Sequence, residues 1–102
     1  MVETMIYRLE CRGKIITYVG DTGPCPGLLN AARDADLFIC EASSPIGEQN
    51  HHYGHLNPRE AGEYAKQANA KHLVVMHYFG VNKPNEMRKD IRKSGFNGQV
   101  TI

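Results

Sequence analysis

The sequence lacks an apolar run of the roughly 18 residues that a membrane-spanning helix requires. Its N-terminus lacks the basic and then apolar pattern of a secretory signal. It also lacks a charge imbalance, because 12 lysines and arginines stand against 11 aspartates and glutamates, a formal net charge of +1. No global field therefore draws the chain to a nucleic acid or a membrane surface. These absences predict a cytoplasmic protein that holds any anionic substrate through local contacts.

Cysteine is scarce as well. The three cysteines, Cys11, Cys25 and Cys40, are odd in number, and no two of them form a Cys-x-x-Cys pair. This pattern excludes a secreted disulfide framework. We predict that Cys11 and Cys40 are small buried apolar residues. Cys25 stands at a predicted helix start, where a thiolate is stabilised, but packing within a loop is favoured over a reactive thiol.

What the sequence contains is one domain's length of chain, residues 1–102, without an internal repeat or a low-complexity linker. Alternating apolar residues from Met5 to Cys11 predict a half-buried strand that pairs with the apolar run 15–19 as an antiparallel hairpin. Further strands are predicted over 37–40, 72–76 and 99–102, and helices are predicted to begin at Pro26, Pro58 and Pro84. The predicted fold is α/β, a mixed sheet with about three helices in the order β-β-α-β-α-β-α-β.

The helix that begins at Pro58 has the clearest start signal. Asn57 is a good cap, proline suits the first helical position, and Glu60 is placed to complete a capping box. Small apolar residues at helical spacing follow, from Ala61 to Ala68, and predict a narrow stripe that packs closely.

Polar side chains follow three of the predicted strands. Asp21 comes after 15–19, Glu41 after 37–40, and His77 after 72–76. Because the carboxyl ends of parallel strands face one crevice, we expect these side chains to converge there.

Each of these residues has a structural alternative. Asp21, in a Gly-Asp-Thr-Gly loop, is either a metal ligand or the cap of its own turn. His77 is either a zinc ligand on a rigid strand end or a core histidine bonded to a backbone carbonyl. Glu41 orients a histidine, holds the long loop that follows it, or is merely a charge at a strand end.

Three histidines lie in the long loop between residues 42 and 56. His55 stands just ahead of a helix N-terminus, where free N–H groups favour an anion, and it is therefore a candidate phosphate or oxyanion contact. His51 and His52 are expected to be solvated.

Four blocks of the sequence together resemble one family. They are Gly20 to Thr22, Ala31 to Ala42, Gly54 to Ala61, and Lys71 to Tyr78. In this order they are similar to the C-terminal half of a metallo-β-lactamase-superfamily hydrolase, in the ribonuclease Z and phosphodiesterase-like branch. The resemblance covers nearly the whole chain and implies half of an αββα sandwich.

The resemblance also implies roles for single residues. Asp21 matches the aspartate that bridges two metal ions, and His77 matches the last histidine ligand of one of them. His55 matches a histidine near the scissile phosphate, which stabilises charge or assists the leaving group. The implied cofactor is zinc or another divalent metal in a two-metal site, which activates water for attack on phosphorus or a carbonyl.

One part of the family pattern is absent from the sequence. The His-x-His-x-Asp-His metal block does not occur, nor does the next histidine ligand, and Asp21 and His77 are fewer than the about three protein ligands of a catalytic zinc. We therefore hypothesise half of a split or truncated hydrolase that binds metal weakly alone. Its partner would be a missing N-terminal half or a second copy of the chain, and its substrate a phosphoester such as RNA or another ester.

Two other functions remain open at this point. One is a non-catalytic homo-oligomeric binding module derived from the same fold. The other starts from Asp21-Thr22-Gly23, which spells the triplet of aspartic proteases, and would be a dimer in which two copies of Asp21 share a proton. That protease fold is nearly all β, whereas this sequence predicts three helices.

Overall fold

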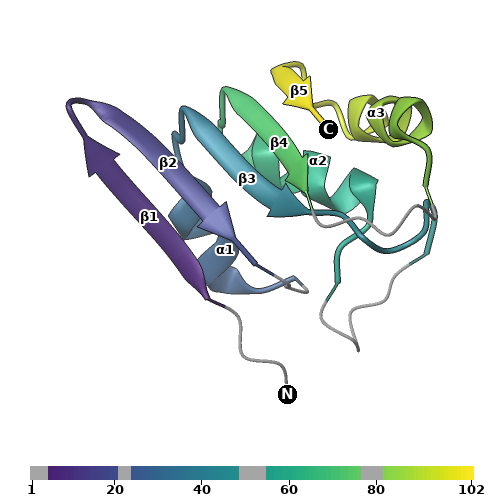
Figure 1. Ribbon diagram of the computed structural model, residues 1–102, viewed down its shortest axis with the longest axis horizontal. Helices are drawn as coiled ribbons and strands as arrows, with labels where there is room; N and C mark the ends of the chain where they lie inside the picture. Colours follow the sequence, from purple (N-terminus) through teal and green to yellow (C-terminus); the bar gives the residue numbers. More distant parts are fainter. Residues whose placement is uncertain (1–4, 21–23, 49–54, 77–81) are drawn as a thin grey trace.

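The computed structural model describes residues 5–20, 24–48, 55–76 and 82–102. In this part of the chain, five strands form one sheet in the order β1-β2-β3-β4-β5 (Figure 1). β1 pairs antiparallel with β2, and the other neighbours are parallel. In chain order the elements are β1 (Ile6–Cys11), β2 (Lys14–Val19), α1 (Pro26–Ala32), β3 (Leu37–Glu41), α2 (Pro58–Gln67), β4 (His72–Met76), α3 (Pro84–Lys93) and β5 (Gln99–Thr101). The predicted element order, hairpin and mixed sheet are confirmed.

The predicted helix signals act as expected. At α2, Asn57 Oδ1 accepts a hydrogen bond from the Glu60 N–H at 2.8 Å, and Glu60 Oε1 accepts one from the Asn57 N–H at 2.9 Å. This reciprocal pair is the capping box. Pro26 and Pro84 begin α1 and α3.

The helices leave one face of the sheet open. α1 and α2 lie against the same face, and α3 packs on α2 (Figure 1). Gly62 lets α2 approach α3 closely, because a Cβ on it would lie only 2.9 Å from the Ile91 carbonyl oxygen. One buried core fills the space between helices and sheet; it includes Leu28, Phe38, Cys40, Ala61, Ala65, Leu73, Val75, Met87 and Ile91. No helix in the described ranges is long and apolar enough to cross a bilayer.

We call the uncovered side of the sheet the outer face. Two rows of paired residues cross it from strand to strand: Tyr7, Tyr18, Ile39, Val74 and Thr101 in one row, and Leu9, Ile16 and Leu37 in the other. Neither row contains a charged side chain. The outer face is therefore apolar over β1, β2 and β3, and on β4 and β5 it also carries the polar side chains His72, Gln99 and Thr101.

β1 shows which way this surface is oriented. The sequence predicted that its apolar side would be buried, but Met5, Tyr7 and Leu9 are 64%, 48% and 61% exposed. Its charged side faces the helices instead: Arg8 donates to the backbone carbonyls of Ala31, in the last turn of α1, and Arg33, its C-cap, at 2.9 and 2.7 Å. Large exposed apolar patches mark interaction surfaces, so β1 is patterned for burial of its outer face.

The cysteine prediction is half correct. Cys40 is buried in the core, as expected, but Cys11 is exposed. Cys11 lies on the same side of β1 as the exposed Tyr7 and Leu9, the side that α1 and α2 do not cover. Burial raises the pKa of the Cys40 thiol far above its ordinary value, and this cysteine is therefore unreactive.

Asp36 connects the hairpin to the segment before β3. Its Oδ2 accepts a hydrogen bond from the Ile15 N–H at 2.8 Å, and its Oδ1 accepts one from Lys71 Nζ at 3.0 Å. The backbone bond first, and then the lysine, lower the pKa of Asp36 below its usual value of 3.8. A lowered folded-state pKa means that Asp36 stabilises the fold above the unfolded-state pKa, and that this stabilisation is lost as the pH falls through the folded-state value.

We expect Asp36→Asn to flatten the fall in stability as the pH drops below about 4. Urea unfolding at a series of pH values measures this slope. Asp34→Asn is the matched control, because Asp34 has a backbone φ of 57°, which asparagine tolerates. An Asp36→Asn profile as steep as that of the unchanged chain would contradict the role of Asp36.

Candidate functional site

The carboxyl ends of β2, β3 and β4 lie at one edge of the sheet. The three strands are parallel neighbours, and Glu41 at the end of β3 pairs with Met76 at the end of β4. Asp21 follows β2 and His77 follows β4, but both lie outside the described residues, as do His51 and His52. Their convergence with Glu41 therefore stays a prediction. The parallel arrangement of β2, β3 and β4, which the prediction requires, is present.

Glu41 has a fully buried side chain although it carries a carboxylate. Its Oε1 accepts a hydrogen bond from the Leu56 N–H at 2.7 Å. Its Oε2 accepts from both the N–H and the hydroxyl of Ser43, each at 2.8 Å. These donors replace water around the buried oxygens. Since they come from the segments after β3 and before α2, the carboxylate joins those two segments.

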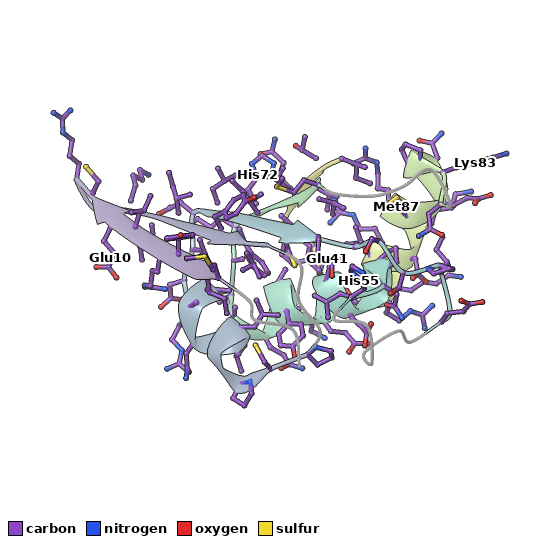
Figure 2. The ribbon with its side chains drawn as sticks, turned by 60° about the horizontal axis from the view of Figure 1, so that its bottom comes forward. Glu10, Glu41, His55, His72, Lys83 and Met87 are labelled. Atoms are coloured by element: carbon purple, nitrogen blue, oxygen red, sulfur yellow. The ribbon has the colours of Figure 1, made fainter. Side chains whose placement is uncertain are left out.

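His55 lies against this carboxylate. Its Nδ1 is 2.9 Å from Ser43 Oγ and 3.7 Å from Glu41 Oε1. The first distance is that of a hydrogen bond, and the second is too long for one. Figure 2 shows Glu41 and His55 together at the end of the sheet, away from His72. Of the alternatives for Glu41, the geometry supports loop holding and histidine orientation, and the plain strand-end charge is wrong.

Ser43 is the member of this cluster that the sequence analysis missed. Its two bonds join residues that are 2 and 12 positions away in the sequence. The first contact is local, and a serine two residues after a strand-end glutamate is a signal that could have revealed it. The second depends on the path of the long loop.

The second ring nitrogen of His55, Nε2, makes no hydrogen bond to the residues that the structure describes. The side chain is 27% exposed, so part of the ring reaches solvent. The N-terminus of α2 has fewer free N–H groups for an anion than predicted. Pro58 has no N–H, and Asn57 Oδ1 already accepts the hydrogen bond of the Glu60 N–H. The group that the site presents to a ligand is therefore the imidazole.

Cys25 packs against the core at the start of α1. It lines a hollow of about 550 Å³ between α1 and α2, together with Tyr64, whose phenol pKa is raised by burial. This placement agrees with the packing role that the sequence favoured.

A metal cluster is not found in the described ranges, where no three His, Cys, Asp or Glu side chains are grouped to hold an ion. Asp21 and His77, the predicted ligands, lie outside the described residues. The polar cluster at this end of the sheet, within the described residues, consists of Glu41, Ser43 and His55.

A hollow of about 520 Å³ lies beside the first turns of α2, and Asn57 forms part of its wall. Its charged lining is mixed: Arg59 and Lys93 are basic, and Glu60, Glu63 and Asp90 are acidic. Among the described residues, the lining of this hollow thus carries charges of both signs.

Residues 2–78 match the profile described as a beta-lactamase superfamily domain. The chain belongs to the metallo-β-lactamase superfamily. The match spans the elements from β1 to β4, including the Glu41, Ser43 and His55 cluster.

Relatives from this superfamily agree in sequence and fold. The chain is 36% identical over 83 residues to ribonuclease Z of Sulfolobus acidocaldarius, a match that covers 80% of this chain and 28% of that protein. The metallo-β-lactamase fold protein YhfI of Bacillus subtilis superposes with a TM-score of 0.87 at 27% identity, over 95% of this chain and 40% of YhfI. The short form of human tRNase Z superposes with a TM-score of 0.65 at 24% identity, over 97% of this chain and 38% of that chain, and shows the fold alone.

The relatives are much longer than this chain. The chain spans about a quarter to two fifths of the length of these relatives, so the activity of a whole relative does not transfer with the family. The superfamily placement gives no support to an aspartic-protease-like use of Asp21. The ribonuclease Z-like resemblance and the α/β fold with a mixed sheet are confirmed.

Proposed function

We propose that this chain provides one part of the active site of a metal-dependent phosphodiesterase, with RNA as the favoured substrate class. The observation that carries the proposal is a half-buried imidazole, His55, anchored to the buried Glu41 and Ser43 pair at the carboxyl edge of the sheet. Ligands of α/β sheets bind at this edge. Relatives named ribonuclease Z support the substrate class.

His55 acts on the departing oxygen in this proposal. When the P–O bond breaks, its electron pair stays on the leaving oxygen, and that oxygen takes a proton from Nε2 of the protonated ring. The anchored Nδ1 fixes the direction of Nε2, and a positioned acid of this kind contributes about 10²- to 10⁴-fold to a rate.

Asp21 and His77 are proposed as metal ligands from the loops that follow β2 and β4. Zinc or another divalent metal, when bound, would polarise the phosphoryl group and lower the pKa of the attacking water. Two ligands are fewer than the about three that a catalytic zinc needs. We therefore propose that a further polypeptide with a His-x-His-x-Asp-His block completes the site.

The outer face is the surface where that polypeptide would pack. It is apolar over β1, β2 and β3, and β1 turns its charged residues away from it. The fraction of the relatives that this chain spans leaves room for such a part.

Zinc titration and phosphodiester hydrolysis test this proposal together. We expect the chain alone to bind zinc weakly and to leave bis(p-nitrophenyl) phosphate intact, and hydrolysis to appear when a polypeptide with the histidine block is added. Tight binding of two zinc ions by the isolated chain would overturn the two-part proposal. Continued absence of hydrolysis in the assembled, metal-loaded pair would overturn the phosphodiesterase.

The alternative function is a non-catalytic homo-oligomeric module. The exposed apolar outer face favours it, because a second copy of the same chain could cover that face and no different polypeptide would be needed. A stable dimer that neither exchanges with the histidine-block polypeptide nor binds metal would support this alternative.

We expect the isolated chain to self-associate through the outer face. Leu9→Lys places a charge in the apolar row and should weaken association by at least about tenfold, because burial of one leucine is lost in each copy. Glu10→Lys is the control, since it puts the same side chain on the opposite side of β1. Light scattering over a concentration series measures both variants, and a compact monomer at every concentration would contradict the expectation.

A further inference from the structure

The serine between Glu41 and His55 determines where the ring proton lies. Glu41 Oε1 is 3.7 Å from His55 Nδ1, beyond hydrogen-bond distance, whereas Ser43 Oγ is 2.9 Å from Nδ1 and 2.8 Å from Glu41 Oε2. The hydroxyl therefore bridges the carboxylate and the imidazole, which do not bond to each other directly.

Counting donors fixes the direction of this bridge. Two backbone N–H groups, of Ser43 and Leu56, point at the Glu41 carboxylate, and an N–H can only donate. In its ionised form the carboxylate can only accept, and the 2.8 Å contact to Ser43 Oγ then contains the single hydroxyl proton. The hydroxyl then has only lone pairs left for the imidazole. Nδ1 of His55 must donate to it.

We propose that Ser43 is a positioning residue that holds His55 in its Nδ1–H tautomer. The chain of hydrogen bonds runs from the His55 Nδ1–H to Ser43 Oγ, and from the Ser43 hydroxyl to Glu41 Oε2. Glu41 is hydrogen-bonded to the ring through this hydroxyl and not directly. In the neutral ring Nε2 therefore carries the lone pair, and on protonation Nε2 gains the proton that faces the substrate.

The significance for catalysis rests on the proposed function. A ring held in the other tautomer would present a protonated Nε2 even when neutral and would turn its lone pair toward Ser43. With Ser43 in place, the neutral ring has its lone pair on Nε2. Nε2 takes up a proton when the ring is protonated, and it donates that proton to the leaving oxygen. The tautomer itself can be measured without any activity.

Two-bond ¹H–¹⁵N correlation spectra of the full chain at about pH 8, where free histidine is neutral, report the tautomer of each ring. The His55 signals are assigned by their loss in His55→Gln. We expect Nδ1 of His55 to resonate as a protonated nitrogen and Nε2 as an unprotonated one. The reverse pattern in the unchanged chain would overturn the proposal.

Substitutions at two neighbouring serines separate positioning from folding. Ser43→Ala should change the His55 tautomer ratio by about fivefold, the equivalent of one net hydrogen bond. Ser43→Thr keeps the hydroxyl and should restore the original ratio. Ser44→Ala is the matched control, because the Ser44 hydroxyl is buried and has no hydrogen-bond partner among the residues that the structure describes. Unchanged His55 signals in folded Ser43→Ala would overturn the proposal, and so would a failed rescue in folded Ser43→Thr.

The assembled enzyme provides a second measurement. Ser43→Ala should lower kcat about tenfold with KM unchanged, since the serine touches the imidazole and not the substrate. If no hydrolysis is found at all, the proposed function fails while the tautomer result still stands or falls by itself.

Discussion

His55→Ala is expected to lower kcat of the assembled phosphodiesterase by about 10²- to 10⁴-fold, the range that a positioned general acid supplies. The reason is geometric. Its Nδ1 is held by Ser43, and Nε2 has no partner in the described part of the chain, so the ring has one nitrogen fixed and one free for the substrate. The measurement is steady-state hydrolysis of bis(p-nitrophenyl) phosphate at saturating metal.

Stability measurements separate a loss of kcat from a loss of folded protein. The His55 ring is partly exposed and makes one hydrogen bond, so we expect His55→Ala to cost only about 1 kcal/mol of unfolding free energy. Glu63→Ala, an exposed change on α2, should leave kcat within about twofold. An His55→Ala enzyme that keeps full kcat would remove His55 from the reaction.

Glu41→Leu is expected to lower the unfolding free energy by about 3–5 kcal/mol, the largest stability effect that we predict. The carboxylate is fully buried and satisfies the N–H groups of Ser43 and Leu56 and the Ser43 hydroxyl. Leucine would fill the space but leave those buried donors without an acceptor. For a domain of this size we expect a fall in Tm of more than about 12 °C.

Two further variants show whether the carboxylate itself matters. Glu41→Gln keeps the shape but turns an NH₂ group toward donors, so it should lose about 2 kcal/mol or more. Glu63→Gln changes the same functional group on the surface of α2 and should stay within about 0.5 kcal/mol. Urea unfolding followed by circular dichroism provides the numbers. A loss below about 1 kcal/mol in Glu41→Leu would show that the three hydrogen bonds do not hold the loop together.

Local signals in the sequence account for the predictions that hold. The hairpin follows from two apolar runs separated by a short turn, and α2 begins where Asn57, Pro58 and Glu60 stand at capping-box spacing. These contacts lie within a few residues of each other, so their geometry is encoded locally. The superfamily was accessible for another reason, because four separate blocks occur in the required order.

The errors have one physical source. A period of two in β1 shows that its two sides differ, but it does not say which side the helices will cover. Arg8 reaches the end of α1, and the apolar side, with Tyr7 and Leu9, therefore faces outward. Cys11 lies on the same outward side of β1 as Tyr7 and Leu9 and is exposed for the same reason.

The sequence by itself determined the strands and helices and the residues that follow each strand, because these depend on neighbours along the chain. It also indicated the superfamily, through the order of four separate blocks. Only the tertiary structure decided that Glu41 is buried and bonds to Ser43 and Leu56, and that Ser43 stands between Glu41 and His55. These contacts form when the segment after β3 meets the segment before α2. Their geometry depends on how α2 packs against the sheet, which no local pattern specifies.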